Sequence, residues 1–158
     1  MNQSQQISSS RPSAAAVNSI VSALLTVQTH GKGFVDLTAD VAKFVREAAA
    51  REGAVTLFIR HTSASLTIQE NADPSVLADL ETALSRLAPA DFAWTHDTEG
   101  PDDMPAHVRT MLTGTSLQIP VLDGKLALGT WQAIYLVEHR SRPHAREVVL
   151  QFLGAARA

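Results

Sequence analysis

Residues suited to chemistry gather in three short segments of the sequence. The first is His61-Thr62-Ser63-Ala64-Ser65, which places an imidazole and three hydroxyl groups within five residues. O–H and N–H donors of this kind can bind a phosphate or another anion. A turn whose hydroxyl groups hydrogen-bond their own backbone has the same composition, and the segment taken alone favours that simpler interpretation.

The second segment runs from His96 to His107 and contains two imidazoles and four carboxylates. Imidazole and carboxylate are the usual ligands of a divalent metal where no thiolate is present, and the chain has no cysteine. His96 and His107 do not have the one-turn spacing of a helical metal motif, so a loop must fold back to bring them together. Acidic residues near the start of a helix also stabilise it without any metal, and both interpretations stay open on spacing alone.

The third segment combines Gly129-Thr130-Trp131-Gln132 with the charged group Glu138-His139-Arg140. Trp131 offers a flat face on which a ring could stack, and the Gln132 amide can both donate and accept hydrogen bonds. A core tryptophan beside a glycine bulge and a solvated charge run at a strand end explain the same residues equally well.

Composition excludes several classes of function. The formal net charge of −3 and the pI of about 6.0 give no basic surface for nucleic acid or for anionic lipid. No stretch approaches the roughly 18 apolar residues of a membrane span, and the absence of cysteine excludes disulfides and thiol catalysis. We therefore expect a soluble cytoplasmic protein without nucleic-acid or membrane partners.

The apolar pattern predicts the elements that must position these residues. Residues 1–20 are expected to form a flexible extension, and residues 21–158 a single α+β domain. Two main helices are expected. One passes through Val41, Phe44 and Ala48 and stops at Gly53, and the other is capped by Asp73 with Pro74 at its first position. A long loop from 94 to 105 and a short helix over 106–112 should follow. Strands are predicted over 24–27, 34–37, 54–60, 65–69, 116–121, 125–128, 131–138 and 146–153, mostly antiparallel in sequential order, with a hairpin at Asp123-Gly124.

Four ordered strings together resemble the YjbQ family, which has been called secondary thiamine-phosphate synthase-like. They are HTSASLTIQENADP (61–74), HDTEGPDDMPAH (96–107), GTSLQIPVLDGKLALGTWQ (114–132) and EHR (138–140). The resemblance extends from about Val21 to the C-terminus. It implies an antiparallel β-sandwich that assembles as a homotrimer, with a polar pocket near the subunit interface that contains the motif histidines. It also implies weak thiamine-phosphate synthase activity, in which a hydroxymethylpyrimidine diphosphate joins a thiazole phosphate and releases pyrophosphate.

The resemblance assigns His61, His96 and His107 to the pocket by position, whereas His139 matches only the EHR string. We expect these three imidazoles to bind a divalent ion, with zinc favoured and water in the fourth position. Asp103 would orient an imidazole or accept a proton, with His107 as its catalytic partner, unless Asp103 only caps the helix that leads to His107.

The remaining roles concern the substrate, which we expect to be a small phosphorylated molecule. Ser63, Ser65 and Arg140 are predicted to hold its phosphate, while Trp131 stacks on its ring and Gln132 hydrogen-bonds it. Preorganised donors would stabilise the charge on departing pyrophosphate. The alternative is a trimeric module that binds a metal or an anion without turnover.

Overall fold

Strands dominate the computed structural model, which describes residues 7–157. In this part of the chain eight strands form two antiparallel sheets. The larger sheet has the order β1 (Ser19–Gln28), β8 (Ala145–Ala156), β3 (Ala50–Ile59), β5 (Ser116–Leu122) and β6 (Lys125–Leu126). The smaller sheet has the order β2 (Gly33–Asp36), β7 (Gln132–Glu138) and β4 (Ala64–Glu70). Apolar side chains of both sheets meet in one core, which confirms the predicted α+β fold with antiparallel sheets.

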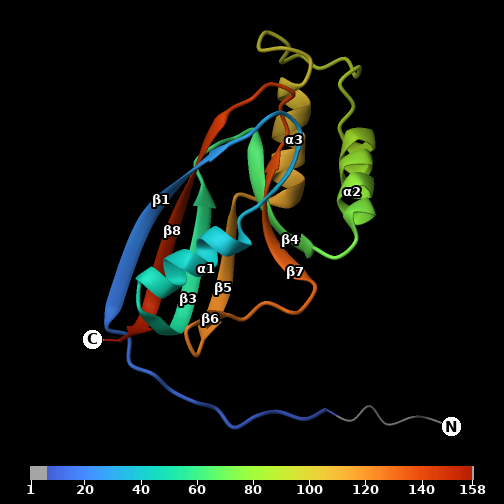
Figure 1. Cartoon of the computed structure of the whole chain (residues 1–158). Coiled ribbons are helices and arrows are strands. Elements are labelled where there is room, and N and C mark those ends of the chain that lie inside the picture. Colours follow the sequence, from blue (N-terminus) through green and yellow to red (C-terminus); the bar gives the residue numbers. More distant parts are fainter. Residues whose placement is uncertain (1–6, 158) are drawn as a thin grey trace, which may run out of the picture.

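Three helices are seen among the described residues, and they correspond to the two main helices and the short third helix predicted (Figure 1). Helix α1 (Thr38–Glu47) buries Val41, Phe44 and Val45 in the common core. Helices α2 (Pro74–Leu87) and α3 (Asp103–Thr113) pack beside the smaller sheet, chiefly through contacts of α3 with β4. The expected short helix over 106–112 begins three residues earlier, at Asp103, and this shift places Asp103 on the helix itself.

Strand β7 is the central strand of the smaller sheet and is covered on both faces. Its residues Ala133–Glu138 are all buried, so the strand lacks the alternation of apolar and polar residues typical of a half-exposed strand. One face meets the core shared with the larger sheet, and the other meets the helices. The strand delivers Glu138, His139 and Arg140 to the end of the molecule at which α3 begins.

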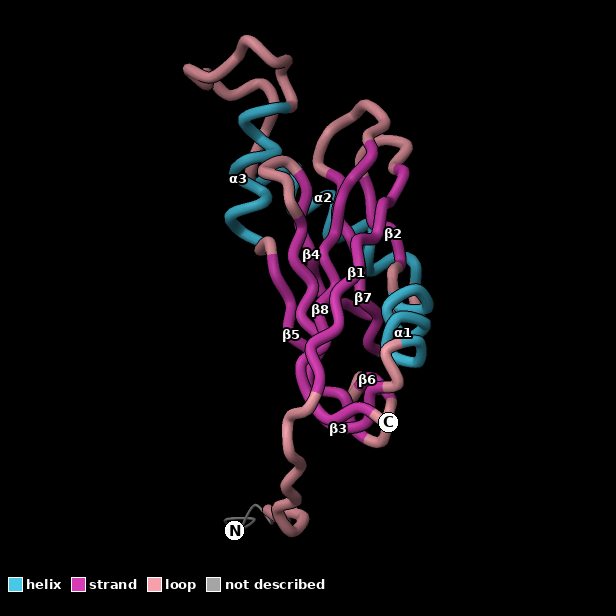
Figure 2. The backbone as a smooth tube through the Cα atoms, turned by 90° about the vertical axis from the view of Figure 1, so that its left-hand side faces the viewer, coloured by secondary structure: helices cyan, strands magenta, loops and turns pink. Residues whose placement is uncertain are grey.

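The outer face of the larger sheet is not covered by any helix of the described region. In Figure 2 its strands face the viewer while the helices lie at the edges or behind. Large apolar side chains on this face are exposed, among them Ile20, Leu24, Phe58 and Leu153. A polar row that includes Ser22 and Gln151 separates Ile20 and Leu153 from Leu24 and Phe58. Exposed apolar side chains gathered on one sheet face are nevertheless typical of a surface that binds another protein.

Several local predictions are confirmed. The Asp73 carboxylate accepts a hydrogen bond from the Ser75 amide at 2.8 Å, and Pro74 occupies the first turn of α2. Asp123 and Gly124 both have positive φ and join β5 to β6 in a hairpin.

Two predictions are wrong. Of the neighbouring strand pairs in the described residues, only β5–β6 is sequential, because β8 inserts between β1 and β3 and β7 between β2 and β4.

The second error concerns Gly53, which was expected to stop α1. That helix ends at Glu47, and Gly53 lies inside β3 opposite Gly154 of β8. A Cβ atom on Gly154 would collide with the carbonyl oxygen of Glu52 and would lie 2.7 Å from Cα of Gly53. The two glycines therefore permit a close approach of two strands.

The N-terminal region joins the sheet at Ser19, two residues before the expected domain boundary. Residues 7–18 lie outside helices and strands, and the Asn18 amide group hydrogen-bonds the backbone of Ala156. The part of the expected extension over residues 1–6 lies outside the described residues. Between residues 7 and 157, no helix is both long and apolar enough to span a membrane.

Candidate metal centre

The first turn of α3 places two candidate ligands on one side of the helix. Asp103 and His107 are four residues apart, which brings their side chains together on a helix surface. Nε2 of His107 lies 3.4 Å from Oδ2 of Asp103. The loop between α2 and α3 adds His96, whose Nε2 lies 2.8 Å from the same oxygen. One ligand atom from each of these three residues lies within 4.8 Å of the others.

The tautomer of His107 is fixed by its other ring nitrogen. Nδ1 lies 3.0 Å from the carbonyl oxygen of Thr62, and a carbonyl oxygen can only accept a hydrogen bond. Nδ1 therefore carries the proton, which leaves Nε2 of the neutral ring with a lone pair directed toward Asp103. Metal-binding histidines are typically oriented by such a second hydrogen bond.

The Asp103 carboxylate is 3% exposed and is shared between two sets of partners. Oδ2 faces the two imidazoles, whereas Oδ1 accepts a hydrogen bond from Nη1 of Arg140. No side-chain hydrogen bond caps α3, so the contacts of Asp103 point to the histidines and not to helix capping. These contacts are those of a carboxylate oriented by a cation on the side away from the imidazoles.

Arg140 is engaged on the inner side of this centre. Its Nη2 donates to the carbonyl oxygen of Glu99 at 2.8 Å, and its Nε lies 3.4 Å from Oδ1 of Asp102. The described contacts of the guanidinium are to Asp103, Asp102 and the loop, and its predicted contact with a phosphate stays a prediction. Its position supports Asp103 and ties β7 to the loop before α3.

Asp102 forms the link between that loop and the turn after β7. Its Oδ2 accepts hydrogen bonds from both the amide and the hydroxyl of Ser141, each at 2.7 Å. Burial opposes ionisation of Asp102, but the hydrogen bonds from Ser141 and the charge of Arg140 outweigh it and lower the pKa of this carboxyl below its ordinary value.

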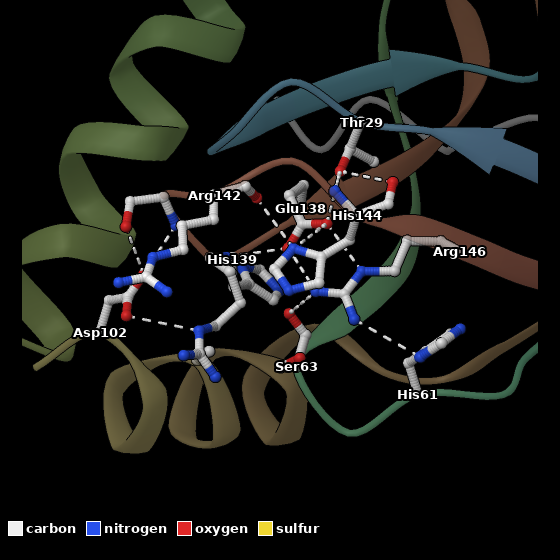
Figure 3. A network of polar contacts seen from close by, with 12 residues as sticks. Thr29, His61, Ser63, Asp102, Glu138, His139, Arg142, His144 and Arg146 are labelled. Atoms are coloured by element: carbon white, nitrogen blue, oxygen red, sulfur yellow. Dashed lines mark hydrogen bonds and ion pairs between the residues drawn. The ribbon is translucent and has the colours of Figure 1, made fainter. Parts of the chain in front are cut away.

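His61, which was predicted as a metal ligand, is not part of this group. Its Nε2 accepts a hydrogen bond from the Glu147 amide at 3.1 Å, and its Nδ1 faces Nη1 of Arg146 at 3.4 Å. Figure 3 shows its ring beyond Arg146 on the side away from Asp102. Burial and then the charge of Arg146 lower the pKa of His61. In the set that the structure brings together, Asp103 takes the place of His61.

A second polar network lies at the end of β7, around Glu138. This carboxylate is fully buried and accepts hydrogen bonds from Nε and Nη2 of Arg146 at 2.7 and 2.6 Å (Figure 3). Thr29 and the amide of Arg140 donate to it at 2.9 Å each. Burial opposes its ionisation, but these donors outweigh burial and lower the pKa of Glu138.

His139 and Ser65 form a third buried contact, on the helix side of β7. Nε2 of His139 lies 2.8 Å from Oγ of Ser65, which also bonds Thr113 of α3 at 2.6 Å. Burial, reinforced by the charge of Arg109, lowers the pKa of His139 to about 4. The interpretation of Glu138-His139-Arg140 as a solvated charge run is therefore wrong for its first two residues.

Apart from Arg140, which binds Asp103, the predicted anion and ring contacts lie outside the metal group. The Ser65 hydroxyl is buried and already paired, so it cannot reach a ligand. Ser63 lines a hollow of about 540 Å³ with His61 and Thr62, and its carbonyl oxygen lies 3.5 Å from Nη2 of Arg146.

Trp131 and Gln132 lie at the opposite end of β7 from Arg140. Six residues of a strand span roughly 20 Å at about 3.3 Å per residue, so one small ligand cannot touch both ends within one chain. Trp131 is 64% exposed, and the Gln132 amide oxygen accepts a hydrogen bond from the Gly129 backbone at 2.8 Å. Trp131 is therefore neither a core residue nor part of this centre.

Chemically, the arrangement offers two imidazoles and one carboxylate with an open side. His96 and His107 keep 45% and 34% of their side chains exposed, so the group is accessible from solvent. Two histidines and a carboxylate form one of the ligand sets of catalytic zinc, in which water takes the fourth position. The residues present therefore fit a divalent ion.

Comparison with known proteins matches residues 23–155 to the family described as UPF0047 protein YjbQ-like. A UPF0047 protein of Synechocystis sp. is 48% identical over 132 residues, which cover 83% of this chain and 90% of that protein. The UPF0047 protein YjbQ of Escherichia coli O157:H7 is 38% identical over 131 residues, which cover 82% of this chain and 95% of the relative.

Solved structures give the same result. A crystal structure from Clostridium acetobutylicum, described as an uncharacterized conserved protein of the YjbQ/UPF0047 family, is 36% identical with a TM-score of 0.75 and covers 84% of this chain and 98% of its own. The conserved hypothetical protein TT1486 of Thermus thermophilus is 38% identical with a TM-score of 0.71, with coverages of 80% and 97%. Sequence and fold agree that the chain belongs to the UPF0047 YjbQ-like family.

Proposed function

We propose that this protein is a metal-dependent enzyme that acts on a small phosphorylated substrate. His96, Asp103 and His107 would hold the divalent ion, with zinc favoured. The observation that carries the proposal is the pair of contacts that orients the ligands: the Thr62 carbonyl on Nδ1 of His107 and Arg140 on Asp103. Coupling of a pyrimidine diphosphate with a thiazole phosphate would be a low side activity.

The charge around the centre supports a cation there. Four carboxylates lie within seven residues, those of Asp97, Glu99, Asp102 and Asp103. Arg140 forms ion pairs with the last two of them. An anionic substrate approaching these carboxylates alone would be repelled. When bound, a divalent ion would supply Lewis-acid polarisation of a phosphoryl oxygen.

The protein's own residues would act by position and charge. Arg140 holds one oxygen of Asp103, which keeps the other oxygen of that carboxylate directed at the imidazoles. The Thr62 carbonyl keeps the proton of neutral His107 on Nδ1. In this proposal Asp103 and His107 are ligands, and no free general base is assigned.

The metal content of the protein and its affinity for zinc test the proposed metal site. We expect protein purified without chelator or affinity tag to contain zinc by elemental analysis, and calorimetry to show one site per chain. His107→Ala should weaken zinc binding by more than tenfold, as should Asp103→Asn, since even the loss of a residue that only orients a ligand costs about 10–100-fold. His30→Ala and Asp123→Asn, at exposed positions outside the group, are the controls. Equal zinc affinity in all four variants would refute the site.

Turnover is tested separately on zinc-loaded protein. Release of pyrophosphate from hydroxymethylpyrimidine diphosphate and thiazole phosphate should be measurable and should be lost in His107→Ala. If zinc binds but no pyrophosphate is released, the transferase assignment falls and a metal- or anion-binding module becomes the better explanation.

We also propose that the chain assembles as a homotrimer. The uncovered apolar face of the larger sheet, with Ile20, Leu24 and Phe58 exposed, supports association through that face. Light scattering should give three times the chain mass at micromolar concentration, and Leu24→Glu should lower it. A monomeric mass for the unaltered protein would refute the assembly.

A further inference from the structure

The loop between α2 and α3 carries a pair of aromatic side chains beside the candidate metal centre. The rings of Phe92 and Trp94 lie with their centroids 4.6 Å apart at an angle of 51°. The indole N–H of Trp94 donates to the carbonyl oxygen of Pro89 at 2.9 Å, which fixes its ring within the loop. Phe92 is nevertheless 60% exposed, so most of its ring is open to a ligand.

These two rings form part of the wall of a hollow of about 360 Å³. The incoming arm of the loop contributes Phe92 and Trp94, and the returning arm contributes Gly100 and Pro101. His96, which is one of the three candidate ligands, also lines the hollow. The hollow is therefore continuous with the metal centre through His96.

The hollow has the size and the wall chemistry for one flat ring. An apolar cavity of about 150 Å³ already holds benzene, so this volume suits a single ring with substituents. Aromatic walls favour a ring that stacks on them or meets their edges. Trp131, on the other hand, is exposed at the far end of β7 and cannot serve this site within the same chain.

Charge limits how such a ligand can be oriented. Asp97 also lines the hollow, and Asp103 lies behind its wall residue His96 at 2.8 Å, so an anionic group would be repelled there. The anionic end of a ligand can be accommodated only at a bound cation. The ring itself must then be uncharged, or positively charged.

We propose that this hollow is the ring-binding subsite of the protein, which accepts a planar aromatic ring whose anionic substituent reaches the His96–Asp103–His107 centre. The inference rests on the proposed function, because the substituent needs the metal. It assigns substrate selectivity to Phe92 and Trp94, two residues of the loop to which no role has been given.

The test compares two phosphate esters of six-membered rings, one flat and aromatic and the other puckered and saturated. For zinc-loaded protein, calorimetry should show phenyl phosphate binding about tenfold more tightly than cyclohexyl phosphate, the size of a typical stacking contribution. Phe92→Ala should bring the two affinities to within about twofold of each other while leaving the zinc affinity unchanged. Leu87→Ala, which removes an exposed apolar side chain from α2, should keep the selectivity. Equal affinities for the two esters in zinc-loaded protein would overturn the subsite and leave the metal centre standing.

A second measurement examines the hollow without a metal. In the nuclear magnetic resonance spectrum of metal-free protein, phenol should shift the indole N–H signal of Trp94 more than cyclohexanol does, with the signal of Trp131 as an internal control. If zinc fails to bind but phenol shifts the Trp94 signal selectively, the proposed function fails and the ring site stands. If neither alcohol shifts it, the ring site is refuted whatever zinc does.

Discussion

Replacement of Glu138 by glutamine is expected to destabilise the protein more than any change to its surface charges. Glu138 is fully buried and its partner Arg146 is 4% exposed. The substitution keeps the shape of the side chain but removes the charge that neutralises Arg146. Breaking one half of a buried ion pair costs about 3–5 kcal/mol, because the other charge stays buried without compensation.

The surroundings of Arg146 indicate that this cost is not relieved locally. Apart from Glu138, its guanidinium faces Nδ1 of His61 at 3.4 Å and the carbonyl oxygen of Ser63 at 3.5 Å. Both contacts are long, and neither partner carries a negative charge. The exposed pair Arg60–Glu147, at 3.0 Å, gives the matched control, since pairs of that kind contribute about 0–1 kcal/mol.

Urea unfolding at pH 7 and a fixed protein concentration measures the difference. We expect Glu138→Gln to lower the unfolding free energy by about 3–5 kcal/mol and Glu147→Gln by less than about 1 kcal/mol. Adding Arg146→Met to Glu138→Gln should cost little more, because it removes the uncompensated charge. The pKa of Glu138 is lower in the folded protein than in the unfolded chain. The stability that Glu138 contributes is therefore complete at pH values above its unfolded pKa, and it is lost as the pH falls through its folded pKa. A loss below about 1 kcal/mol for Glu138→Gln would refute this account of the network.

Two further predictions concern burial and close packing. The pKa of His139 falls from 6.5 in the unfolded chain to about 4 in the folded protein, so the stability that this residue contributes is complete above pH 6.5 and declines toward pH 4. Urea unfolding should therefore show a fall in stability between pH 7.5 and 5 that is smaller in His139→Gln, and equal falls in the two proteins would contradict the assignment. Gly154→Ala should destabilise the sheet by about 1–3 kcal/mol, as overpacking does, because its Cβ would collide with the Glu52 carbonyl oxygen. An unchanged thermal midpoint would show that β3 and β8 can separate there at no cost.

Local signals in the sequence were sufficient for most elements of the fold. Asp73-Pro74 and Asp123-Gly124 act through their own backbone geometry, and both features are present as predicted. The order of the strands depends on contacts between distant segments, such as β8 between β1 and β3, and no local pattern reports these. Gly53 illustrates the limit of local patterns, because its role depends on Gly154, which lies about a hundred residues away in the sequence.

The candidate site was only partly predictable for the same reason. The segment from His96 to His107 was recognised by composition, and the helix that begins at Asp103 explains why Asp103 and His107 meet. His61 shares a motif with Ser63 but lies across Arg146, a separation that spacing along the chain cannot reveal. The buried pairs Glu138–Arg146 and His139–Ser65 were missed because charged residues after a strand usually face water.

The complete burial of β7 has a consequence for how this strand finds its place during folding. A strand with one wet face is held in register by hydrophobicity, because a slip of one residue turns its apolar side chains outward. The run from Ala133 to Val137 is apolar on both faces, so such a slip would cost it little. A slip of one residue would exchange the positions of Glu138 and His139. The carboxylate would move away from Arg146 toward Ser65, and the imidazole would move toward the buried guanidinium. Glu138 and His139 at the end of β7 thus select one register of the strand. The same register brings Arg140 to Asp103.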